Sequence, residues 1–181
     1  FYIPEDVTYL NIASQSPAFK AIYEAGLEGL KQKNQPHKIR ISDYFEPVTE
    51  LKKLFAQLID EDNFNRIATI PSVSYGIATV ANNIILKEND EILIIDEQFP
   101  SNVYSLWNEI ILNTINNNTA VVAMGNIHWS NGSLFNLKAI SKKAKQHDAL
   151  LIIDGSQSVG ALPFSVKDIQ PDALICAGYK W

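Results

Sequence analysis

Apolar and polar residues alternate along this chain with two periods, one typical of strands and one typical of helices. Short apolar runs bounded by turn residues predict five strands, at 66–72, 91–97, 119–128, 150–156 and 172–178. Segments with apolar residues at helical spacing predict five helices, at 17–33, 47–60, 74–85, 101–113 and 136–149. Short apolar strands that alternate with helices predict a three-layer α/β/α fold with a mostly parallel sheet.

The composition is that of a globular protein with a sizeable core. The chain has 181 residues, of which 46% are hydrophobic and 19% charged, and its formal net charge is −5. No dense group of lysines and arginines occurs, so neither nucleic acid nor an anionic membrane surface is the expected partner. No apolar segment approaches the ~20 residues of a membrane span. Cys176 is the single cysteine, which excludes an internal disulfide and favours a cytoplasmic location.

Polar loops follow each predicted strand. They are PSVSYG at 71–76, DEQFPSN at 96–102, IHWSNG at 127–132, DGSQSVG at 154–160 and AGYK at 177–180. Open α/β sheets bind ligands in the crevice beyond the carboxyl ends of their strands. The sequence therefore predicts a site built from these loops at one edge of the sheet.

Three common chemistries do not match these loops. The chain has neither a G-x-G-x-x-G dinucleotide motif nor a G-x-x-x-x-G-K-[ST] phosphate loop. Its three histidines lie far apart in sequence and form no metal-binding pair, so no metal is expected. The G-x-S-x-G elbow of serine hydrolases is also missing.

The remaining strand-end residues are Asp154, Gln157 and Lys180, together with a serine-rich helix start. Pyridoxal phosphate needs a lysine for its Schiff base, an acidic partner for its pyridinium nitrogen, donors for its phosphate and a ring to stack on. These residue types favour pyridoxal 5'-phosphate as the cofactor.

The run IIDGSQSVG followed by AGYKW resembles the class V aminotransferase family of fold-type I pyridoxal phosphate enzymes. That family includes cysteine desulfurases, selenocysteine lyases, kynureninases and isopenicillin N epimerase-like proteins. The opening YLNIASQSP is similar to the family's N-terminal signature. The resemblance implies a cofactor-binding large domain over residues 1–181, entered through an N-terminal segment and helix at 1–33. It also implies a homodimer, a continuation of the large domain and a small C-terminal domain that these residues do not include.

The resemblance assigns the central roles to three residues. Lys180 would form the internal aldimine, Asp154 would pair with the protonated pyridine nitrogen, and Gln157 would hydrogen-bond the 3-hydroxyl of the cofactor. The alternatives are a solvated lysine at a strand end and, for Asp154, a helix N-cap.

The family pattern also points to a phosphate site at the helix that PSVSYG begins. Val73 and Ser74 would supply backbone amides and Ser74 its hydroxyl, at a helix end whose free N–H groups suit an anion. A plain N-cap role is the alternative for Ser74. Tyr179, which stands where many desulfurases have histidine, would reach the phosphate through its hydroxyl, as in kynureninase-like members.

Other loop residues would contact the ring or the substrate. Phe99 would stack on the pyridine ring in place of the desulfurase histidine, which disfavours a desulfurase; a buried core aromatic is the alternative. His128 and Trp129 would line the cofactor and substrate side, although a structural role for this histidine is equally compatible. Near the start, Asn11, Ala13 and Ser14 would approach the substrate carboxylate.

The implied activity is that of an enzyme acting on an amino acid by elimination, transamination, racemisation or hydrolysis. Cysteine desulfurase-like lyase and aminotransferase activities lead, with a kynureninase-like hydrolase or an epimerase as alternatives. A non-catalytic homologue that only binds the cofactor and a nucleotide-binding interaction domain are further possibilities. Cys176, on a predicted buried strand, is not expected to be the cysteine that carries a persulfide in desulfurases. The last strand would leave an unpaired apolar edge, so these 181 residues alone are expected to be insoluble or inactive.

Overall fold

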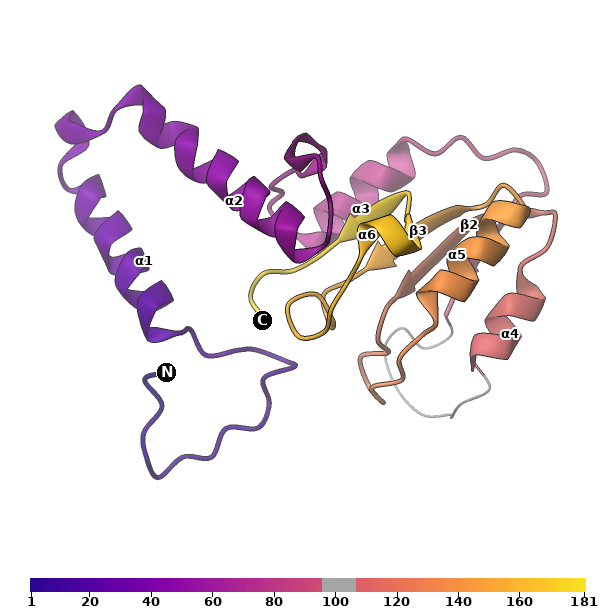
Figure 1. The fold of residues 1–181 in the computed structure, drawn as a ribbon, viewed down its shortest axis with the longest axis horizontal. Coiled ribbons are helices and arrows are strands. Elements are labelled where there is room, and N and C mark those ends of the chain that lie inside the picture. Colours follow the sequence, from indigo (N-terminus) through magenta and orange to yellow (C-terminus); the bar gives the residue numbers. More distant parts are fainter. Residues whose placement is uncertain (96–106) are drawn as a thin grey trace.

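A four-stranded parallel sheet forms the centre of the protein. The computed structural model describes residues 1–95 and 107–181. The strands are β1 (Glu91–Ile94), β2 (Thr119–Gly125), β3 (Leu150–Asp154) and β4 (Ala173–Ile175). They lie side by side in sequence order, β1-β2-β3-β4, and all neighbouring pairs are parallel (Figure 1).

Helices cover both faces of this sheet. Helix α3 (Val73–Asn82) packs its Val73 and Val80 against the sheet cluster of Val121, Ile152 and Ile175. The other face is covered by α4 (Trp107–Thr114), α5 (Leu137–Gln146) and the short α6 (Val166–Ile169). Alternate side chains of a strand point to opposite faces, so the β3 residues contribute in turn to the two layers of core. The predicted three-layer α/β/α fold with a parallel sheet is confirmed.

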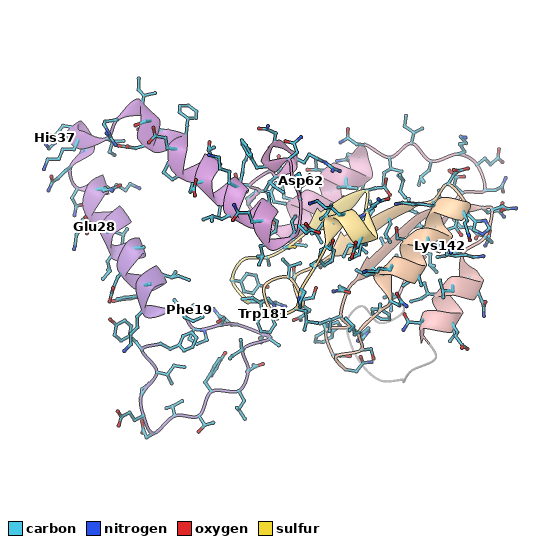
Figure 2. The ribbon with its side chains drawn as sticks, in the orientation of Figure 1. Phe19, Glu28, His37, Asp62, Lys142 and Trp181 are labelled. Carbon is cyan, nitrogen blue, oxygen red and sulfur yellow. The ribbon has the colours of Figure 1, made fainter. Side chains whose placement is uncertain are left out.

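The first third of the chain forms an arm beside this sheet. It contains α1 (Lys20–Lys33), the 3-10 turns η1 (Pro36–Lys38) and η2 (Ile41–Tyr44), α2 (Glu46–Leu58) and the turn η3 (Phe64–Arg66). No α1 residue is buried against the described parts of the chain, and Figure 2 shows Glu28 and His37 far from the sheet. The helices predicted at 17–33 and 47–60 are confirmed, but only the end of α2 joins the core, through Phe55 and Ile59.

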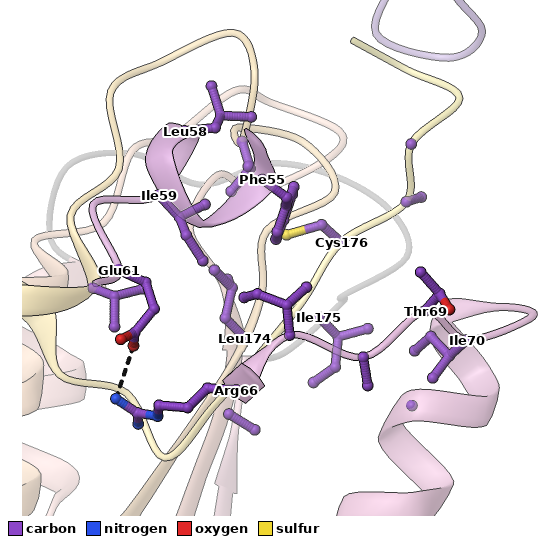
Figure 3. Close-up of a pocket in the computed structure, with 18 of the residues that line it drawn as sticks. Phe55, Leu58, Ile59, Glu61, Arg66, Thr69, Ile70, Leu174, Ile175 and Cys176 are labelled. Carbon is purple, nitrogen blue, oxygen red and sulfur yellow. Dashed lines mark hydrogen bonds and ion pairs between the residues drawn. The ribbon is translucent and has the colours of Figure 1, made fainter. Parts of the chain in front are cut away.

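The strand predicted at 66–72 is wrong. Residues 67–70 form no element, although the Ile67 backbone is extended, with φ −92° and ψ 129°. A strand requires a hydrogen-bonded neighbour, and a cavity of about 640 Å³ lies between this segment and β4, lined by Thr69, Ile70, Leu174 and Ile175 among others (Figure 3). Within the described residues, no ladder pairs 67–70 with β4.

The remaining predictions of secondary structure agree with the structure to within a few residues at each end. Of the helix expected at 101–113, the described residues contain α4 from position 107 onward, and positions 101–106 lie outside them. Side-chain caps fix several starts: Ser72 accepts from Tyr75 N at 3.1 Å before α3, and Asn136 accepts from Ala139 N at 3.1 Å before α5. In the described residues, no helix is both long enough and apolar enough to cross a membrane.

The central strand should dominate stability. Ile153 in β3 is fully buried, with 0% exposure, whereas Ile85 is 91% exposed. Ile153→Ala removes buried methyl groups and leaves a cavity, which should lower the free energy of unfolding by about 2–5 kcal/mol. Ile85→Ala is the matched control and should change it by less than ~0.5 kcal/mol. Urea denaturation followed by circular dichroism measures both; equal losses would contradict the proposed core.

Candidate active site at the carboxyl edge of the sheet

Asp154 marks the point where β3 ends and the site begins. In the register of the sheet, Asp154 lies opposite Gly125 at the end of β2 and Ile175 at the end of β4. Because Ile152 faces the α3 layer, strand alternation places the Asp154 side chain on the α3 side as well. Its Oδ1 accepts a hydrogen bond from Ser156 N at 2.9 Å. Within the described residues, this is the one hydrogen bond to the carboxylate, so acceptor capacity remains for a ligand.

A small cavity of about 70 Å³ adjoins Asp154. It is lined by Ile95, Gly125, Ile127, His128, Trp129, Phe135, Asp154 and Gln157. The structure therefore brings four of the predicted site residues, from the loops after β2 and β3, around one space. Gly125 allows the backbone to pack closely at this cavity, because a Cβ added there would lie 3.0 Å from the Ile127 carbonyl oxygen.

His128 is a buried wall of this cavity, with 5% exposure. Its Nδ1 lies 3.1 Å from Ser130 Oγ, and its backbone N donates to the Ser133 carbonyl at 2.8 Å. The loop that holds it is closed by a second bond, from Gly132 N to the His128 carbonyl at 2.9 Å. His128 and Trp129 thus have defined places beside Asp154, in a loop that follows β2.

Lys180 reaches the same edge through the loop after β4. Gly155 N donates to the Ile175 carbonyl at 2.8 Å, Ala177 N donates to Ser156 Oγ at 3.0 Å, and the Trp181 indole donates to the Ser156 carbonyl at 3.2 Å. These three bonds hold the end of the chain against the loop after β3. They explain why Lys180, 26 positions beyond Asp154 in sequence, lies in the same region.

Gln157 joins Lys180 to the N-terminal segment. In the amide orientation that satisfies both partners, its oxygen accepts from Lys180 Nζ at 2.9 Å and its nitrogen donates to the Ala13 carbonyl at 3.2 Å. A second link, from Ser16 N to the Tyr179 carbonyl at 3.3 Å, holds the two segments together. Figure 1 shows the N-terminal trace extending to the C-terminal end of the chain. Asn11 and Ser14, predicted near the substrate, lie in this same turn with exposed side chains.

The predicted phosphate residues lie at the start of α3, on the face of the sheet that Asp154 also faces. The N-cap is Ser72, so the alternative that made Ser74 the cap is wrong; Ser74 lies exposed in the first turn. Tyr179 is exposed, and its hydroxyl has no hydrogen-bond partner among the described residues. Among the described residues, no hydrogen bond joins Val73 or Ser74 to Lys180. Phe99, predicted to stack on the ring, lies outside the described residues.

Sequence reasoning missed Ser156. This residue is buried, with 8% exposure, and bonds to Asp154, Ala177 and Trp181 through its amide, hydroxyl and carbonyl. A serine two residues after a strand-end aspartate was the available signal, since such a hydroxyl can satisfy the backbone of a neighbouring loop. No cluster of His, Cys, Asp and Glu able to hold a metal occurs among the described residues.

Cys176 lies behind this edge, on the wall of the large cavity next to β4 (Figure 3). Burial, and next the negative charge of Asp154, raise the pKa of its thiol from 9.0 to about 12, against a smaller opposing effect of the Gly155 amide. A thiol with such a pKa stays protonated at neutral pH and is a weak nucleophile there.

This burial predicts a slow reaction of Cys176 with thiol reagents. A pKa of about 12 instead of 9.0 lowers the thiolate fraction about a thousandfold at pH 8. Labelling with Ellman's reagent should therefore be slow in the native protein and fast in urea, with one thiol released per chain. Because the raised pKa favours the folded thiol below pH 9, this contribution to the free energy of unfolding should be lost as pH rises from about 9 to about 12. Fast native labelling would contradict this placement of Cys176.

Comparison with known proteins agrees with this architecture. Residues 105–181 match the family model Aminotransferase class-V. A putative cysteine desulfurase of Plasmodium berghei is 27% identical over 166 residues, covering 72% of this chain and 31% of that protein. The hercynylcysteine sulfoxide lyase of Schizosaccharomyces pombe is 22% identical, covering 100% of this chain and 53% of that protein.

Solved structures show the same fold. The cystine C–S lyase C-DES superposes with a TM-score of 0.83 at 20% identity, covering 98% of this chain and 54% of that one. The cysteine desulfurase CsdA of Escherichia coli gives a TM-score of 0.70 at 16% identity, covering 93% of this chain and 50% of that one. The chain thus spans about a third to a half of the length of these relatives. Residues 105–181 are thus similar to the class V aminotransferase family, and the chain as a whole has the fold of the cystine C–S lyase C-DES.

Proposed function

We propose that this chain forms part of the cofactor-binding large domain of a pyridoxal phosphate-dependent enzyme that acts on an amino acid. The observation that carries the proposal is the meeting of Asp154, Gln157 and Lys180 at one edge of the sheet. Asp154 and Gln157 belong to the loop after β3 and Lys180 to the loop after β4, and hydrogen bonds of Ser156 and Gln157 hold these two loops together. An acid, an amide and an amine are the groups that this cofactor's ring and aldehyde require.

The residues present fit the cofactor. The Asp154 carboxylate has acceptor capacity beyond its bond to Ser156, and it lines a cavity together with Gln157. The Val73 and Ser74 amides lie at the start of a ten-residue helix, where free N–H groups and the helix dipole attract a phosphate. Tyr179, with an exposed hydroxyl, remains the proposed additional phosphate contact, and Phe99 remains the proposed stacking ring.

Each residue then has a physical task. When bound, the cofactor serves as an electron sink that stabilises negative charge at the substrate Cα. Asp154 would hold a proton on the ring nitrogen by accepting its hydrogen bond, because a carboxylate favours the charged form of a neighbouring base. The Lys180 amine would hold the cofactor and, once displaced, accept the proton that leaves the substrate Cα. His128 and Trp129 would line the substrate side.

The chemistry of the relatives favours cleavage of a carbon–sulfur bond. The sulfoxide lyase and the C-DES lyase act on sulfur compounds by their names, and a variant of C-DES has been solved with glycine covalently linked to the pyridoxal phosphate cofactor. We therefore propose a cysteine desulfurase- or lyase-like activity on a sulfur-containing amino acid. Aminotransferase activity is the second candidate, favoured by an aminotransferase relative in Bacillus subtilis at 23% identity. A homodimer and a cytoplasmic location remain predictions.

Absorption spectroscopy tests the cofactor. Addition of pyridoxal phosphate to the longest soluble form of the protein should produce the visible band typical of this cofactor bound to a lysine. Lys180→Ala should abolish the band, whereas Lys142→Ala, which removes an exposed lysine of α5, should retain it. Asp154→Asn should retain a band with weaker cofactor affinity, by about tenfold or more, since a charge-assisted hydrogen bond contributes ~1.5–3 kcal/mol.

Two outcomes of the same absorption experiment would contradict these proposals. A band of equal strength in wild type and Lys180→Ala would exclude Lys180 as the anchor. A folded wild-type protein that gives no band at saturating cofactor would contradict the proposed function.

A further inference from the structure

The Gln157 side chain lies between two partners of opposite polarity. The Lys180 ammonium can only donate hydrogen bonds, and the Ala13 carbonyl can only accept them. The amide therefore has one satisfying orientation, with its oxygen 2.9 Å from Lys180 Nζ and its nitrogen 3.2 Å from the Ala13 oxygen. If the Ala13 carbonyl moved away, only Lys180 would constrain the amide.

The position of the Ala13 carbonyl is set by a closed turn. The Tyr9 hydroxyl donates to the Gln15 carbonyl at 2.7 Å and lies 3.2 Å from the Asn11 carbonyl. The Asn11 carbonyl also accepts from Ser14 N at 3.1 Å and Gln15 N at 3.2 Å. Tyr9 thus joins both ends of the turn whose centre is Ala13. The bond from Ser16 N to the Tyr179 carbonyl fixes this turn beside Lys180.

We propose that the turn of residues 9–16 is a positioning element for Lys180, with Tyr9 as its key side chain. By fixing the Ala13 carbonyl, the turn holds the Gln157 amide with its oxygen toward Lys180. In this arrangement Tyr9 acts on Lys180 through the Ala13 carbonyl and the Gln157 amide. The proposal rests on the proposed function for its biological meaning, because it concerns the amine that would hold the cofactor.

The expected consequence is a change in how the Lys180 amine reacts. The Gln157 oxygen holds the Lys180 nitrogen in one place, and this contact must break before the nitrogen can attack an electrophile, so the contact lowers the reactivity of the amine. A loosened turn lets the Gln157 amide rotate and weakens the contact. The turn of residues 9–16 would thus control how readily the Lys180 amine reacts with an electrophile, such as the aldehyde of a cofactor.

Competitive acetylation of the cofactor-free protein tests this. A limiting amount of an acetylating reagent is added, and the labelling of Lys180 is measured by mass spectrometry as a ratio to Lys142 in the same molecules. Tyr9→Phe should raise this ratio roughly two- to tenfold, the factor expected for one hydrogen bond, and Gln157→Leu should raise it at least as much. Tyr23→Phe removes an exposed hydroxyl without a hydrogen-bond partner among the described residues and should leave the ratio unchanged.

A double-mutant cycle separates positioning from a general loss of structure. In Gln157→Glu, the carboxylate still accepts from Lys180 but has no donor for Ala13, so adding Tyr9→Phe should change the ratio by less than twofold. A ratio unaffected by Tyr9→Phe in the wild-type background would overturn the proposal. An equal increase in both backgrounds would also overturn it, since the effect would not pass through the Gln157 amide.

These measurements contain no cofactor, so they remain interpretable whatever the absorption experiment shows. A protein that binds no pyridoxal phosphate but shows the predicted labelling ratios would lose the proposed function and retain the positioning role. A protein that binds the cofactor at Lys180 with unchanged ratios would retain the function and lose the positioning role.

Discussion

The carboxyl ends of β2, β3 and β4 are aligned in the sheet, and this alignment determines where the site forms. Gly125, Asp154 and Ile175 lie opposite one another, so three parallel strands end on one line and their loops share one crevice. The strand interiors are apolar and buried, with Val122, Leu151 and Ile153 at 2% exposure or less. A shift of one residue would move these side chains to the opposite layers and Asp154 with them. Burial of these apolar side chains therefore fixes the register of β3 and, with it, the position of the Asp154 carboxylate.

The loops that follow these strand ends are joined to one another mainly by hydrogen bonds. Ser156 contacts Asp154 on one side and the end of the chain on the other, and close packing needs Gly155, where a Cβ would lie 2.8 Å from Cys176 Sγ and 2.7 Å from Val159 Cγ2. Gln157 extends the network to the N-terminal segment. The central parallel sheet supplies position, and a few directional hydrogen bonds supply the orientation of the lysine and the amide.

Most of the helices and strands could be predicted from the sequence, because the spacing of apolar residues indicates which side chains are buried. The runs at 91–97, 119–128, 150–156 and 172–178 contain strands, whereas Asp154, Gln157 and Lys180 stay predictions that rest on their positions after strands and on a family resemblance. The segment at 66–72 was wrong because an apolar run gives no information on whether a neighbouring strand pairs with it; here a cavity separates it from β4. The roles of Ser156 and Tyr9 depend on contacts between segments far apart in sequence, which local pattern does not encode.

In the function proposed above, this strand edge presents Lys180, among all lysines of the chain, to an aldehyde cofactor beside Asp154. The most direct measurement is reduction of the protein–pyridoxal phosphate mixture with borohydride, followed by digestion and mass-spectrometric mapping of the modified lysine. We expect one dominant modified lysine, Lys180, when the cofactor is added in near-stoichiometric amount. Label distributed over the exposed lysines, or found mainly at a lysine other than Lys180, would contradict it.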